Sequence, residues 1–76
     1  MDPALAFGNV LRAARKEAGL TQEQLAHTAG VDRTSVSLFE RGINQPTIRM
    51  LFKLATALGV SPSKLILLTE QGIGAD

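Results

Sequence analysis

The chain contains no cysteine and a single histidine, His27. The absence of cysteine excludes disulfides, thiolate metal sites and thiol catalysis, and one imidazole cannot build a multi-histidine metal centre. A domain of 76 residues buries a limited share of its surface and is marginally stable without the usual supports of disulfides, metals or oligomerisation. Of these three supports, oligomerisation is the one that the composition leaves open.

Aromatic residues are few, and long apolar runs and an excess of one charge are missing. The aromatics are three phenylalanines, no apolar run exceeds four residues, and eight basic residues face seven acidic ones. Such runs are far too short to span a bilayer, and no signal-peptide pattern follows Met1. We therefore expect an intracellular protein with no membrane partner.

Catalytic patterns are absent as well. The sequence has no glycine-rich phosphate loop, no nucleophile placed with a base and no spaced carboxylate pair. His27 is expected on the exposed side of its helix with no second ligand. We predict a protein that is not an enzyme and that carries no metal, no cofactor and no small-molecule effector.

What the sequence does contain is an apolar periodicity of three and four, which predicts an all-α fold of five helices. Helix starts and stops are given by capping residues, prolines and glycines. The predicted helices are bounded by Asp2-Pro3 and Gly19, by Thr21 and Gly30, by Asp32 and Gly42, by Thr47 and Gly59, and by Ser61-Pro62 and Thr69.

The last two helices carry the largest share of aliphatic side chains. On the fourth, the predicted inward face is Ile48, Leu51, Phe52, Ala55 and Leu58. On the fifth, Leu65 and Leu68 are predicted to point inward and Leu67 outward. We expect one domain over residues 1–69 and a flexible tail over residues 70–76.

Residues 21–41 have the layout of a helix-turn-helix, two helices joined by about four residues that include a glycine. On a helical wheel of the second of these helices, Val36 and Phe39 point inward together. The opposite face carries small hydroxyls and two arginines, namely Arg33, Thr34, Ser37, Leu38 and Arg41. Such a face suits insertion into a DNA groove.

These segments resemble the lambda-repressor-like, Cro/Xre-type helix-turn-helix family. The resemblance runs in order through Leu11-Arg12 to Arg15, residues 19–26, Ala29-Gly30-Val31, Ser35-Val36-Ser37, Glu40-Arg41-Gly42, Pro46-Thr47 and residues 54–61. It covers about residues 7–68. It implies a compact five-helix DNA-binding domain whose helix-turn-helix is formed by the second and third helices.

The resemblance also implies which residues read bases. Family members use the first turns of the third helix, at the positions of Arg33, Thr34, Ser37 and Leu38. Arginine can bond guanine O6 and N7 with both prongs, and leucine can pack on a thymine methyl. The alternatives are a solvated or phosphate-bound Arg33, and a Leu38 that shields the surroundings of Phe39.

Phosphate contacts are predicted for a second set of residues. The resemblance implies them for Gln22, Arg41, Asn44 and Gln45, and the place of Ser35 on the side of the third helix, near its N-terminus, adds that residue. Gln22 alternatively completes a cap, Ser35 helps to cap its helix, and residues 42–46 form a polar turn without a ligand. The resemblance further implies an internal ion pair between Arg15 and Glu40, which would orient the first and third helices.

Because one such domain offers little interface, we expect a homodimer on a two-fold symmetric DNA site. The predicted dimer interface is Met50, Ile66 and Leu67. The function predicted is a cytoplasmic, bacterial or phage-type transcriptional regulator that binds double-stranded DNA. A restriction–modification controller protein and a phage-type repressor both fit. The alternatives are an antitoxin that binds a partner toxin and represses its own operon, and a helix-turn-helix kept for protein contacts alone.

Overall fold

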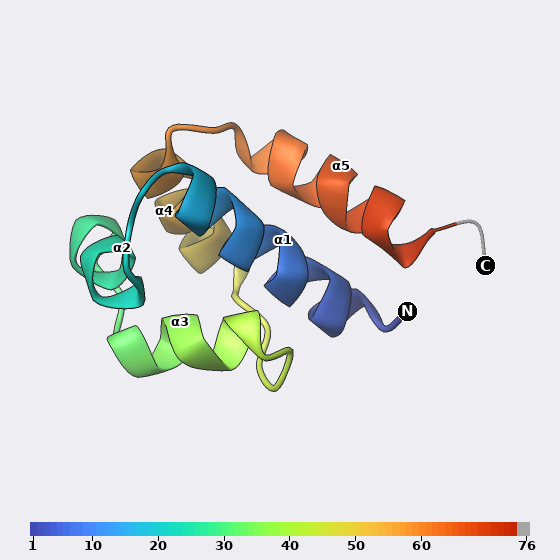
Figure 1. The fold of residues 1–76 in the computed structure, drawn as a ribbon, viewed down its shortest axis with the longest axis horizontal. Coiled ribbons are helices and arrows are strands. Elements are labelled where there is room, and N and C mark those ends of the chain that lie inside the picture. Colours follow the sequence, from blue (N-terminus) through green and yellow to red (C-terminus); the bar gives the residue numbers. More distant parts are fainter. Residues whose placement is uncertain (75–76) are drawn as a thin grey trace.

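A computed structural model describes residues 1–74 and contains five helices, α1 to α5, with no strand in that range. They span Pro3–Glu17, Gln22–Ala29, Arg33–Glu40, Ile48–Leu58 and Pro62–Ile73. In Figure 1, α1 runs through the middle of the molecule with α5 alongside it and α3 across its other side. The predicted all-α, five-helix fold is confirmed.

Local capping chemistry explains where most of the helices begin. The Asp2 carboxylate accepts hydrogen bonds from the backbone N–H groups of Ala4 and Leu5 at the start of α1. Thr21 and Gln24 form a reciprocal capping box at α2. Thr47 and Ser61 cap α4 and α5 through their hydroxyl oxygens. These interactions satisfy N–H groups that have no partner inside the helix.

The core lies where all five helices meet. Its fully buried side chains include Leu11, Leu25, Val36, Leu54 and Leu65, one from each helix. Burial of this apolar surface holds the short α2 and α3 in place, since helices of eight residues are not stable alone. The position of α3 is therefore fixed by tertiary packing.

The predicted faces of the last two helices need correction. Ile48 is 72% exposed and Phe52 55% exposed, so the inward face of α4 is formed by Leu51, Leu54 and Ala55, with Leu58 half-buried. Leu68, predicted inward, is 37% exposed, whereas Leu65 is buried and Leu67 exposed as predicted. Helix α4 packs against both α2 and α5, and its buried arc is the one that these two helices cover.

Helix α5 also continues past the predicted end of the domain. It extends to Ile73, so residues 70–73 of the expected tail are helical. Thr69 is buried and its hydroxyl donates to the Leu65 carbonyl. Ala75 and Asp76, the end of the expected tail, lie outside the described residues.

Within residues 1–74 no single helix has the length and apolar character to cross a membrane. Helices α4 and α5 pass such a test only as a pair, with a bend of 102° between them.

Candidate nucleic-acid interface

The turn between α2 and α3 is formed by Gly30, Val31 and Asp32. Gly30 has φ +71°, a left-handed conformation that glycine adopts without steric cost. The Val31 N–H donates to the Ala26 carbonyl at 3.0 Å, which closes the end of α2. The half-buried Val31 packs against the core, and the turn therefore sets α3 at a fixed angle to α2.

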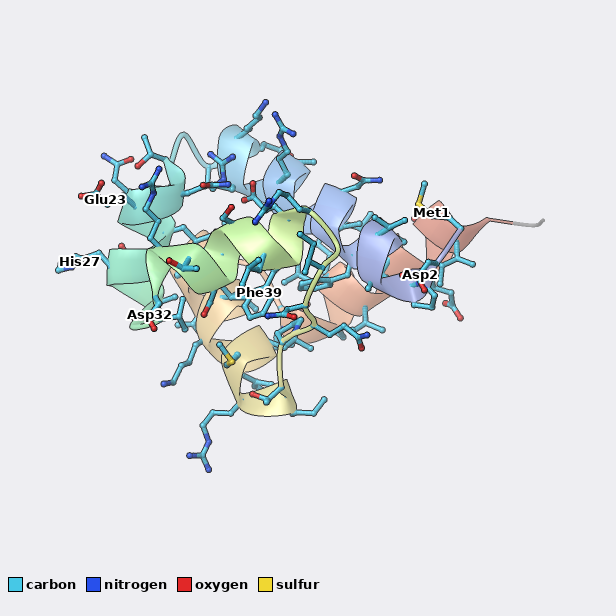
Figure 2. The ribbon with its side chains drawn as sticks, turned by 90° about the horizontal axis from the view of Figure 1, so that it is seen from below. Met1, Asp2, Glu23, His27, Asp32 and Phe39 are labelled. Atoms are coloured by element: carbon cyan, nitrogen blue, oxygen red, sulfur yellow. The ribbon has the colours of Figure 1, made fainter. Side chains whose placement is uncertain are left out.

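Helix α3 has a buried face and an accessible face. Val36 and Phe39 are 0% and 3% exposed, whereas Arg33 and Thr34 are exposed and Ser37 and Leu38 half-buried. Figure 2 shows α3 across the front of the molecule, with Asp32 at its N-terminal end. The accessible face carries the four predicted base-reading residues. Among residues 1–74, the polar side chains of this set have no hydrogen-bond partner, which leaves their donors free for a ligand.

A buried polar network ties α3 to α1 and α2. Arg15 donates from Nε to Glu40 Oε2 at 2.6 Å and from a second nitrogen to Glu40 Oε1 at 3.1 Å. The third nitrogen of Arg15 donates to the Leu20 carbonyl at 2.9 Å. The side chains are 11% and 3% exposed. The predicted partners Arg15 and Glu40 therefore lie in direct contact.

The electrostatics of this pair follow from the hydrogen bonds. The hydrogen bonds to Glu40 raise the pKa of Arg15 above its ordinary value, although burial of the guanidinium works in the opposite direction. Because the pKa of Arg15 is raised, the stability that its ionisation contributes is present throughout the physiological range and is lost as the pH rises through that pKa. The charge of Glu40, which would repel phosphate, is compensated internally.

Gln22 belongs to the same network, which the sequence did not predict. Its amide Nε2 donates to Glu40 Oε1 at 3.1 Å, and the side chain is half-buried. An amide nitrogen carries two hydrogens, so one donor remains for another acceptor. A hollow of about 400 Å³ lies beside Gln22 and is lined by residues of the α1–α2 turn together with Arg33. The structure thus brings Arg33 and Gln22 to one hollow.

The remaining predicted phosphate contacts lie on different sides of α3. Arg41, Asn44 and Gln45 are exposed in the loop after α3, and Ile43 and Asn44 donate backbone N–H groups to the Leu38 carbonyl. Ser35 is half-buried on another side, in a hollow that it shares with Met50 and Lys53 of α4. Asp32 has the extended backbone of a capping residue, yet its carboxylate makes no capping hydrogen bond, contrary to the prediction.

Two of the three residues predicted for a dimer interface, Met50 and Ile66, line different hollows. Ile66 and Leu67 are 51% and 50% exposed on α5. Met50 is half-buried against the core and lies in the hollow beside Ser35 and the turn. Ile66 instead shares a hollow of about 210 Å³ with Ile48 and Leu51 of α4, beside Asn44 and Gln45.

Among residues 1–74, no group of three or more histidine, aspartate or glutamate side chains comes together.

Comparison with known proteins matches the helix-turn-helix family model to residues 11–65. A relative named as the HTH-type transcriptional regulator y4dJ of Sinorhizobium fredii is 38% identical over 71 residues, which cover 93% of this chain and 92% of the relative. The restriction–modification controller protein C.AhdI of Aeromonas hydrophila has a similar crystal structure. Its TM-score is 0.80 at 42% identity, over 82% of this chain and 94% of that chain.

A second solved structure contains DNA. The restriction–modification controller protein C.Esp1396I, a tetramer in complex with its natural 35-base-pair operator, matches with a TM-score of 0.85 and 30% identity. The match covers 96% of this chain and 96% of that chain. The family match spans the helix-turn-helix and the helices around it, and the chain belongs to the lambda-repressor-like, Cro/Xre-type helix-turn-helix family of transcriptional regulators.

Proposed function

We propose that this protein binds double-stranded DNA sequence-specifically as a homodimer, with α3 in the major groove. The observation that carries the proposal is the contrast between the two faces of α3. The inner face is packed and its last residue, Glu40, is fixed by three hydrogen bonds, while the outer face offers free polar groups. A rigid helix with unpartnered donors is suited to reading base edges.

Within this proposal, some side chains contact bases and others contact phosphates. Arg33, near the start of α3, bonds guanine through two donors, and Thr34, Ser37 and Leu38 contact neighbouring base edges. Gln22 bonds a phosphate with the amide hydrogen that Glu40 leaves free. Arg41, Asn44 and Gln45 contact the backbone from the loop after α3. Base contacts specify the sequence, whereas phosphate contacts fix the register.

The homodimer is supported by an apolar face on α4 and α5. Ile48, Phe52 and Ile66 are 72%, 55% and 51% exposed, and Ile48 and Ile66 line the same hollow. Phe52 follows Ile48 by one helical turn and extends the same face. Large apolar side chains gathered in this way mark an interaction surface. A second copy is the occupant we propose, because a two-fold dimer presents two α3 helices to successive turns of DNA.

Selection from a random duplex library tests the function. We expect a two-fold symmetric site whose half-sites lie about ten base pairs apart. Arg33→Ala should relax one position in each half-site and weaken the selected site by roughly 1–3 kcal/mol per protomer. Gln22→Ala is the matched comparison, and it should weaken selected and unrelated duplexes alike.

Failure to enrich any sequence at low salt would overturn the proposal. Enrichment of a site without two-fold symmetry would leave DNA reading intact and overturn the homodimer.

A further inference from the structure

A second hollow lies beside α3, on the side away from Gln22. It has a volume of about 440 Å³ and is lined by Gly30, Val31, Asp32, Ser35, Met50 and Lys53. Arg33 lines the hollow next to Gln22, and Ser35 lines this one. Two residues along a helix are separated by roughly 200° of rotation, so the two hollows border opposite long edges of α3.

The floor of this hollow is fixed. Val31 and Met50 are half-buried and pack against the hydrophobic core. Lys53 is exposed in the second turn of α4, the helix that Thr47 caps. Because α2 also packs against α4, the backbone that carries Lys53 cannot shift freely relative to the turn. A ligand here would meet a preformed surface.

The polar groups around the hollow have no partners among residues 1–74. In that range the Lys53 amine, the Ser35 hydroxyl and the Asp32 carboxylate make no side-chain hydrogen bond. Neither Lys53 nor Asp32 takes part in an ion pair there. Lys53 and Asp32 line one hollow without pairing within 4.0 Å. Two free donors therefore lie next to the start of α3.

We propose that Lys53 and Ser35 together hold a DNA phosphate on the strand opposite to the one contacted by Gln22. This proposal rests on the proposed function. A major groove is about 12 Å wide and a helix with its side chains about 10–12 Å across, so a helix in the groove has a sugar-phosphate backbone along each long edge. The ammonium group supplies the charge and the hydroxyl a directed donor.

Asp32 reduces the positive potential of this contact. Its carboxylate lies in the same hollow and is not bound to the helix start. Removal of this charge should therefore strengthen DNA binding, the opposite of the effect of removing Lys53. The substitutions of Asp32 and Lys53 should therefore change the DNA affinity of the same site in opposite directions.

The experiment measures binding of the full chain to its selected operator and to a scrambled duplex, by fluorescence anisotropy between 50 and 300 mM salt. For Lys53→Gln we expect the slope of log affinity against log salt to fall by about two, one for each protomer. At 0.1 M salt the affinity for both duplexes should drop by roughly 10- to 60-fold. Ser35→Ala should weaken binding less, without a comparable change in slope.

Lys64→Gln is the matched control, because Lys64 carries the same charge on α5, in a separate hollow between α1 and α5. It should leave the slope nearly unchanged. Asp32→Asn should raise affinity severalfold without lowering the melting temperature.

A Lys53→Gln slope equal to that of Lys64→Gln would overturn the inference. So would a fall in melting temperature in both Lys53→Gln and Asp32→Asn with no change in slope, since that result indicates that the two side chains pair with each other. A wild-type protein that shows no salt-dependent binding to either duplex would instead overturn the proposed function.

Discussion

The Glu40 carboxylate accepts three hydrogen bonds, two from Arg15 and one from Gln22. Its side chain is only 3% exposed. A buried charge is tolerated when its acceptors are satisfied and a counter-charge lies beside it. The network joins the start of α2 to the end of α3. At the scale of single residues it sets the distance between the proposed phosphate contact, Gln22, and the proposed base-reading surface.

Removal of one partner should be costly. Glu40→Ala leaves a buried guanidinium and the Gln22 amide without their acceptor, and we expect the free energy of unfolding to fall by about 3–5 kcal/mol. Since small domains are stable by about 5–15 kcal/mol, this loss is a large fraction of the total. Urea unfolding measures it.

The apolar double variant Arg15→Met/Glu40→Leu is the control for this effect. It removes both charges, so it should recover much of the lost stability. The double-mutant cycle with the single variants Arg15→Met and Glu40→Leu should give a coupling energy of several kcal/mol. A Glu40→Ala loss below about 1 kcal/mol would contradict the view that the pair is structurally essential.

At the scale of the helices, the contact between α1 and α3 depends on Gly8. A Cβ atom on Gly8 would lie 2.5 Å from the Phe39 carbonyl oxygen and 2.7 Å from the Glu40 carbonyl oxygen. Both obstacles are backbone atoms of the last turn of α3, so the two helices would have to separate. No periodicity in the sequence marks Gly8, because a glycine within a helix carries no side chain to read.

Gly8→Ala should therefore destabilise the protein even though alanine favours helix. Overpacking costs about 1–3 kcal/mol, which exceeds a propensity gain of at most about 1 kcal/mol. Gly72→Ala on α5 is the matched control, because the added Cβ would meet its nearest neighbour, Ala6 Cβ, at 3.8 Å. That variant should be stabilised by roughly 0.5–1 kcal/mol. Thermal unfolding compares them, and an equal effect at both sites would refute the steric argument.

The helix boundaries were largely predictable from sequence, because local chemistry sets them. Asp2-Pro3, the Thr21–Gln24 box, Thr47 and Ser61-Pro62 define helix starts without reference to the rest of the chain. The buried face of α4 was not predictable. Apolar residues cover more than half of its circumference, so the inward arc depends on where α2 and α5 pack.

The proposed site likewise has one part that was predictable from the sequence and one part that was not. Residue types and spacing, with the family resemblance, led to the outward face of α3 and to the Arg15–Glu40 contact. The contribution of Gln22 to that contact joins residues 18 positions apart and follows from how α2 meets α3. Lys53 likewise comes to the start of α3 from a different helix. Such pairings are tertiary and leave no local pattern.

At the scale of the whole molecule, the net charge is close to zero, so the positions of the charged residues matter more than their number. The net charge of +1 predicts weak non-specific attraction to DNA. Glu40, however, is compensated inside the protein, while Arg33, Arg41 and Lys53 are exposed around α3. If each domain makes only the few phosphate contacts proposed, we expect specific affinity to depend on two domains that bind together.

The proposed homodimer can be tested directly at its proposed interface. Ile48→Glu or Phe52→Glu places a charge on the apolar face of α4, and each should raise the dimer dissociation constant at least tenfold in sedimentation equilibrium. Neither residue is buried in the core, so the monomer should stay folded by circular dichroism. Leu67→Glu makes the same chemical change on the outer surface of α5, about 100° around the helix from Ile66. It should dissociate the dimer far less. If Leu67→Glu produces monomers while Ile48→Glu and Phe52→Glu do not, the interface lies on the outer face of α5, and the exposed apolar residues of α4 need another explanation.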